Sequence, residues 1–371
     1  MSHPPTPDTM EPRIESEAEV EEKAKFERSP APEPASSPTL TPAPTPAPAP
    51  AATPMLFSRM FIIAVHPSGT NNLSTLFDLP NQPSIMAIDN LFSGPFKICF
   101  ESSQATNRRF LISNTQTAIQ RNLQEADYAW AHAYGQGKIL CANVCAPWLL
   151  NPSVLNGCPE TDQAVAHCGL FKARVPESYD LVQDGLFNYT NMNLSMFPDE
   201  YLRTWGMAFV IVHPVGLFPL IYRALKYTLF PDPKHSCALH MTYHWMAVLY
   251  RWAETDSAAP TPIVMDADTL IENPVEYAAR FCQQTGLRLD PAPVRFYDAW
   301  VQRQVRERDN KGFGDRFIRL TAEGRSTLDA VIKLAKPRWA EDFGNEAAEM
   351  IEDAVRAAQD DYMYLYDRRL Q

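Results

Sequence analysis

Four short runs of apolar residues predict a buried parallel sheet. They lie at positions 60–65, 138–144, 209–212 and 262–268, and turn residues flank them. Continuous apolar runs of this length are typical of strands that are covered on both faces. Segments with apolar residues at helical spacing lie at 115–134, after 218, and at 239–252, 274–285 and 341–369. Strands that alternate with helices predict an α/β fold with helices on both faces of the sheet.

Composition separates the first 54 residues from the rest of the chain. This segment contains 14 of the 33 prolines, an acidic patch at 15–22 and an Ala/Pro/Thr run. It has too few large apolar residues to offset the chain entropy that folding removes, so we expect a disordered tail. Residues 55–371 are expected to form one α/β domain, in which 152–200 is irregular because it is rich in Pro, Asn, Gly and Asp.

Charge and cysteine usage exclude several classes of function. The net charge is −11, and about half of it belongs to the first 54 residues. The acidic balance argues against a nucleic-acid partner, which requires a concentrated basic face. The seven cysteines form no paired CxxC sets, so we expect reduced thiols in a cytoplasmic protein, with no metal site. The longest apolar run, 207–222, is interrupted by a histidine and two prolines, so no membrane span is expected.

Six segments in order resemble the fungal sulfotransferase-like family. They are HPSGTNNL, KILCANVCAPWLLNP, PDEYLRTWGMAFVIVHPVGLFPLIYRAL, MTYHWMAVLYRW, PIVMDADTLIENP and WAEDFGNEAAEMIEDAVRAAQDDYMYLYDRRL. Their order and spacing extend from about position 60 to the C-terminal helix. The resemblance implies a three-layer P-loop-type fold. It also implies in-line transfer of a sulfuryl group from 3'-phosphoadenosine 5'-phosphosulfate to an acceptor hydroxyl, which needs cations and a base.

The polar residues that serve this chemistry in the family are replaced in this chain. Ser68 stands where the family has a cation after the first His-Pro pair, and Asn143 and Cys145 replace the Lys and His of the second strand. Val212 and Leu220 replace the Arg and Ser that clasp the 3'-phosphate of the donor. An Arg–phosphate contact contributes roughly 1.5–3 kcal/mol, and an apolar replacement leaves the phosphate without hydration.

The retained scaffold and the neutral, apolar pocket suggest a new use of the fold. We interpret the chain as an enzyme of fungal specialised metabolism that binds a hydrophobic small molecule. It would catalyse a cofactor-free cyclisation or rearrangement, for example of Diels–Alder type, since that chemistry depends on restricted conformation and a few hydrogen bonds. No cofactor is expected. The alternatives are a sulfotransferase with relocated contacts and a non-catalytic binding protein.

Polar residues after the predicted strands are the candidate site. Ligands of open α/β sheets bind at the carboxyl ends of the strands, so His66, His213 and His244 are the candidate catalytic residues. The candidate substrate-binding residues are Thr70, Asn71, Asn143, Cys145, Trp148 and Trp245.

Each of these assignments has a structural alternative. The histidines at 66 and 213 could satisfy backbone groups beside their prolines, and the Cys145 thiol could be packed and inert. His240 and His244 stand four residues apart but lack a third ligand, so a metal site is not favoured. The glycine motif at 310–316 is interpreted as an exposed turn.

Deleting residues 1–54 is expected to leave the thermal midpoint of the remaining chain unchanged, because the segment has little apolar surface to bury. Differential scanning calorimetry of the full chain and the deletion variant measures this. A midpoint that falls by several degrees would mean that the tail packs on the domain.

Overall fold

The computed structural model describes residues 57–65, 74, 77–101, 108–155, 171–179, 186–226, 233–290 and 328–371. The predicted tail, the first loop at 66–73 and the glycine motif at 310–316 lie outside these residues. The division of the chain at residue 54 therefore stays a prediction.

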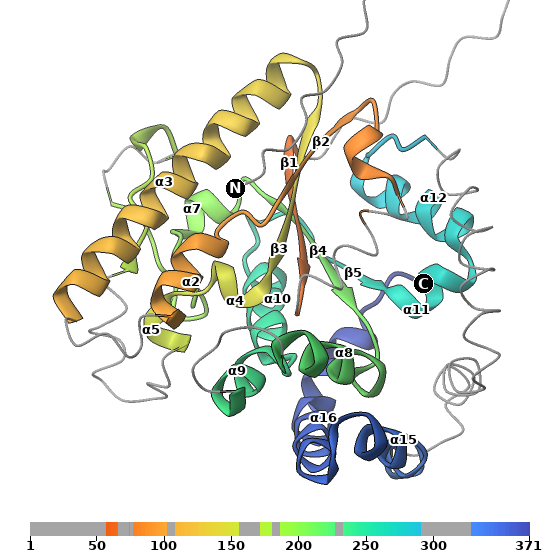
Figure 1. The fold of residues 1–371 in the computed structure, drawn as a ribbon. Coiled ribbons are helices and arrows are strands. Elements are labelled where there is room, and N and C mark those ends of the chain that lie inside the picture. Colours follow the sequence, from red (N-terminus) through yellow and green to blue (C-terminus); the bar gives the residue numbers. More distant parts are fainter. Residues whose placement is uncertain are drawn as a thin grey trace, which may run out of the picture. The chain divides into compact units, whose positions relative to one another are not determined.

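Five parallel strands form one sheet in the order β2-β3-β1-β4-β5 (Figure 1). Their bounds are β1 Arg59–Ala64, β2 Ile85–Asp89, β3 Ile139–Cys145, β4 Gly206–Ile211 and β5 Ile263–Asp266. All residues of β1, β3, β4 and β5 are buried, as the continuous apolar runs predicted. The α/β expectation is confirmed.

Helices connect the strands. The longer ones are α2 Ser93–Glu101, α3 Arg108–Gly135, α8 Pro214–Lys226, α9 Pro233–His240, α10 His244–Thr255, α12 Pro274–Thr285, α15 Leu328–Phe343 and α16 Asn345–Tyr366. The short ones are α4 Ala146–Leu149, α5 Pro152–Leu155, α7 Asp199–Leu202 and α11 Ala267–Glu272, with 3-10 turns at Leu79–Asn81 and Glu177–Tyr179. The described parts of 152–200 hold only the single-turn helix α5, the start of α7, the second 3-10 turn and an isolated bridge at Ser195, as expected for an irregular segment.

Alternate residues of the strands face two apolar clusters. In β1, Phe61 and Ile63 pack with residues of α3, α10 and α16, whereas Met60 and Ile62 pack with residues of α11 and α12. Figure 1 shows α3 and α12 on opposite sides of the sheet. The sheet is therefore covered on both faces, which places its functional surface at a strand edge or a strand end rather than on a face.

Three details of the secondary structure differ from the sequence prediction. The predicted helix at 239–252 is two helices, α9 and α10, separated by residues 241–243, so His240 and His244 lie on different helices. The closing helix begins at Asn345 rather than 341, because Gly344 has φ 92 and ends α15. Strand β2 was not predicted, since it is only partly buried and its apolar run is short.

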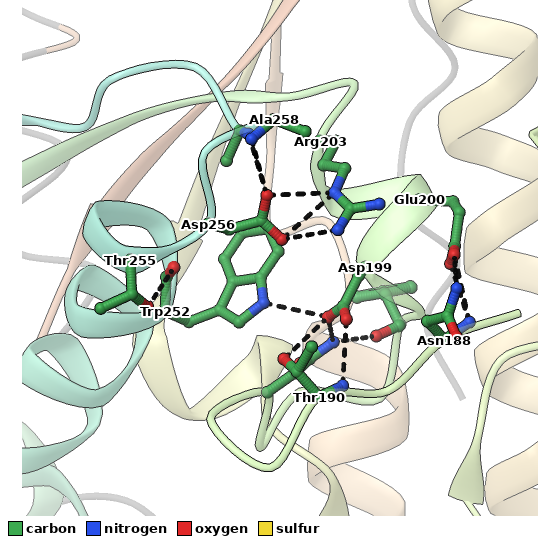
Figure 2. A network of polar contacts seen from close by, with 12 residues as sticks. Asn188, Thr190, Asp199, Glu200, Arg203, Trp252, Thr255, Asp256 and Ala258 are labelled. Carbon is green, nitrogen blue, oxygen red and sulfur yellow. Dashed lines mark hydrogen bonds and ion pairs between the residues drawn. The ribbon is translucent and has the colours of Figure 1, made fainter. Parts of the chain in front are cut away.

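A buried carboxylate organises the chain just before β4 (Figure 2). Asp199 has no exposed surface. It accepts hydrogen bonds from Trp252 Nε1 at 2.9 Å, Asn193 Nδ2 at 2.7 Å and the Thr190 backbone N–H at 3.0 Å. These donors come from α10 and from the 190–195 turn. Asp199 thus joins two segments to the short helix that leads into β4.

We expect Asp199→Ala to lower the free energy of unfolding by about 3 kcal/mol or more, because the buried donors of Trp252 and Asn193 and the Thr190 N–H each lose their acceptor. Asp199→Asn should cost less, since its amide oxygen still accepts. Chemical denaturation measures both variants. The exposed Asp360→Ala is the control and should shift stability by less than about 0.5 kcal/mol. Equal effects of the Asp199 and Asp360 variants would contradict this role.

Candidate functional site

The carboxyl ends of β1, β3 and β4 lie side by side. Strand β1 pairs with β3 on one side, with Ala64 opposite Cys145, and with β4 on the other. The chain order reverses around β1, which makes this the switch point where open α/β sheets bind ligands. The residues that follow or end these strands are Val65, Cys145 and Val212, none of them charged. The candidate site is therefore built from neutral strand ends.

Three candidate residues lie at the end of β3 and are buried. The Asn143 side chain donates from Nδ2 to Asp89 Oδ1 at 2.6 Å. Its Oδ1 atom is buried and has no hydrogen-bond partner among the described residues. Cys145 has no exposed surface, and burial raises the pKa of its thiol well above the ordinary value. Trp148 lies in α4, one turn beyond the strand, and is 7% exposed.

The raised pKa keeps Cys145 as a neutral thiol, which is a poor nucleophile. The unpaired Asn143 oxygen is a different case, because buried polar atoms normally have partners. Within this group, Asn143 is thus the residue whose oxygen can still accept a hydrogen bond.

Backbone donors after β4 are bonded within the protein. The Val212 N–H donates to the Tyr243 hydroxyl at 3.0 Å, and the same hydroxyl donates back to the Val212 carbonyl. The His213 N–H points to Asp268 Oδ2 at 3.4 Å. Backbone N–H groups at the start of a helix are the usual cradle for a phosphate or sulfate. Here two of them already have acceptors, and one acceptor is a carboxylate.

The His213 ring is largely buried at the start of α8. Its Nδ1 accepts from the Val215 N–H at 3.3 Å, and its ring lies edge-on to Tyr362 with centroids 5.2 Å apart. Burial lowers the pKa of His213 from 6.5 to about 4. The ring is therefore neutral at physiological pH. Because Nδ1 accepts, the hydrogen-bond network assigns the ring proton to Nε2.

His244 and Trp245 begin α10, next to Tyr243. The His244 side chain is half exposed, and its Nδ1 lies 3.3 Å from Asp361 Oδ2. Asp361 also pairs with Arg251 at 2.8 Å, and both contacts lower the pKa of its carboxyl group, the His244 bond most. Trp245 is partly buried and donates from Nε1 to Leu239 O at 3.1 Å. His244 thus belongs to a surface charge network beside the predicted site.

Sequence reasoning identified neither Tyr243 nor Asp268 as a member of the site. Asp266 caps α11 by accepting from the Asp268 N–H, and Asp268 contacts the turn after β4. The signal for Asp268 was its place directly after the strand that neighbours β4. Tyr243 carried no signal, since the uninterrupted helix expected at 239–252 gave it no reason to face a strand end.

The remaining candidates, His66, Thr70 and Asn71, lie outside the described residues, and their roles stay predictions. No group of three or more His, Cys, Asp or Glu side chains within the described ranges could hold a metal ion. Among the described helices, none combines the length and apolar character needed to cross a bilayer.

We expect the free energy of unfolding to fall as the pH falls from about 6.5 to about 4. The pKa of His213 is about 4 in the folded chain, against an ordinary 6.5, so the unfolded chain binds more protons in this range. The contribution of His213 is complete above pH 6.5 and is lost as the folded ring titrates. Denaturation at a series of pH values measures it. His213→Asn should flatten the fall, whereas the exposed His132→Asn should not; identical pH profiles in both variants would refute a buried neutral His213.

Comparison with known proteins gives two curated matches, and no family model matches the chain. The chain is 27% identical over 203 residues to sulfotransferase ppzF of Metarhizium rileyi (strain RCEF 4871) and 28% identical to that of Metarhizium majus (strain ARSEF 297). Each match covers 49% of this chain and 58% of the relative, so the chain spans little more than half the length of these relatives. Together with the parallel sheet, the matches confirm the resemblance of the chain to the fungal sulfotransferase-like family.

Proposed function

We propose that this protein is a repurposed sulfotransferase-fold enzyme of fungal specialised metabolism. It binds a hydrophobic small molecule at the carboxyl ends of β1, β3 and β4 and promotes a cofactor-free cyclisation or rearrangement. The observation that carries the proposal is the end of β4. There Tyr243 and Asp268 accept from the backbone N–H groups that an anionic donor would use, beside a neutral His213.

Electrostatics at this edge disfavours a polyanionic donor. A phosphate near the His213 N–H would displace or face the Asp268 carboxylate, and like charges at short range repel strongly where water is scarce. At the positions of the family's phosphate-binding Arg and Ser, Val212 packs against the core and Leu220 is an apolar side chain with 48% exposure. Neither can hydrogen-bond a phosphate, so the donor would lose hydration without compensation.

The same edge suits an uncharged ligand. The exposed Leu220 offers apolar surface, and the His213 ring is neutral, so neither opposes an uncharged ligand. The Asn143 oxygen is a buried acceptor with no partner among the described residues, which a hydroxyl or amide of a ligand would satisfy. Holding a flexible substrate with its reacting atoms oriented lowers the barrier to cyclisation without a cofactor.

A sulfotransferase activity is the second candidate. It rests on the name of the two matched Metarhizium proteins. In this chain it would require donor contacts other than those at Val212 and Leu220, and a cation at a position where the family does not place one.

Calorimetry with 3'-phosphoadenosine 5'-phosphate separates the two candidates. We expect no binding tighter than about 1 mM at the strand ends, which corresponds to about −4 kcal/mol. Asp268→Asn, which keeps the shape of the side chain but removes its charge, tests whether that carboxylate excludes the donor. Micromolar binding that persists when Arg121 and Arg174, exposed cations outside this site, are both replaced by Glu would overturn the proposal. Binding that appears only in the Asp268→Asn variant would support it.

A further inference from the structure

A polar groove lies between α3 and the extended segment 171–175, on residues that the candidate site does not use. Its volume is about 450 Å³. We call it the α3 groove, and its lining is Ser113, Gln116, Thr117, Gln120, Arg121, Gln124, Lys172 and Arg174. Every one of these side chains is polar, and three carry a positive charge.

Local structure explains why these side chains meet. The α3 members recur every three or four residues, which places them on one face of the helix over roughly 16 Å. On the other wall, Phe171, Ala173 and Val175 are buried, so Lys172 and Arg174 between them are exposed. The Gln120 amide, oriented to satisfy both of its groups, donates to Arg174 O at 3.0 Å and accepts from the Arg174 N–H at 2.7 Å. These two bonds fix the width of the groove.

The groove is positively charged, whereas the chain as a whole is negatively charged. The net charge is −11, yet the lining holds three cations and no carboxylate. Within the described ranges, the guanidinium groups of Arg121 and Arg174 form no ion pair. Lys172 Nζ lies 3.9 Å from the centre of the Tyr189 ring, a cation–π contact that holds the ammonium group near the groove. Glu125, four residues after Arg121, accepts from Asn122 instead, and Glu177, three residues after Arg174, forms no ion pair among the described residues. Carboxylates of the described residues therefore do not neutralise the two arginines of the groove.

We propose that the α3 groove binds a small molecule carrying more than one anionic group, of phosphate or carboxylate chemistry. Two guanidinium groups offer forked donors that match such oxyanions, and the side chains of Ser113 and Gln124 add neutral donors along the helix. The volume lies in the range of small-molecule sites, and the length of the polar face exceeds what one oxyanion can span. The groove shares no residue with the site at the strand ends, so it is a second site, independent of the proposed function.

Calorimetry at low salt with pyrophosphate and with citrate tests this proposal and distinguishes phosphate from carboxylate ligands. We expect at least one probe to bind the full chain more tightly than inorganic phosphate does. Arg121→Ala and Arg174→Ala should each weaken that binding at least about tenfold, in keeping with loss of a charge-assisted contact. The double charge reversal R121E/R174E should abolish it. Because both arginine side chains are exposed, the thermal midpoints of these variants should equal that of the unmodified chain.

Lys333→Ala removes one exposed cation from α15, outside the groove, and is the matched control. If it weakens binding as much as Arg121→Ala does, the attraction is non-specific and the proposal fails. Absence of binding to both probes, or binding that survives R121E/R174E, also overturns it. None of these outcomes depends on the site at the strand ends, because its residues are unchanged in all four variants.

Discussion

The Tyr243 hydroxyl holds the candidate site in its observed form. It bonds to both backbone groups of Val212, and its ring packs against Phe218 of α8 and Tyr362 of α16. Its place in the break between α9 and α10 lets the phenol reach the strand end. One side chain thus joins the end of β4 to α8 and α16. The same bond occupies the Val212 N–H, a backbone donor at the surface where the family binds an anion. The packing of Tyr243 and the proposed exclusion of an anionic donor therefore depend on the same hydroxyl.

A second buried polar group has the corresponding role at the opposite end of the central strand. Arg59 begins β1 and is 1% exposed, with Asp127 at 3.4 Å as its ion-pair partner and a hydrogen bond to Thr204. Its guanidinium lies 4.8–5.1 Å from the centres of four rings, those of Trp130, Tyr179, Tyr201 and Trp205. Burial of a charge is costly unless it is paired. The rings and Asp127 together offset that cost and join α3 to the start of the sheet.

The sequence predicted the layers of this fold better than its polar connections. Continuous apolar runs identified four strands because those strands are buried on both faces, whereas β2 is partly exposed and was missed. The partners of Arg59 and Asp199 lie up to 145 residues away in the chain, so no local pattern could indicate them. Of the predicted site residues, Asn143, Cys145 and His213 lie at the ends of adjacent strands, and their role as a site stays a prediction. The hydrogen bonds at the end of β4 depend on Tyr243, whose helix break carried no local signal.

Charge separates the two proposed sites, and this separation decides which ligand each one can take. At the strand ends, the polar groups described above include a neutral imidazole, an amide, a hydroxyl and the carboxylates of Asp89 and Asp268. None of these groups carries a positive charge that would compensate an anion. The α3 groove presents three cations without a carboxylate. An uncharged, apolar molecule loses little on entering the first site and gains little from the second. A polyanion has the opposite preference. A molecule with both an apolar part and several anionic groups would therefore not be bound well by either site alone.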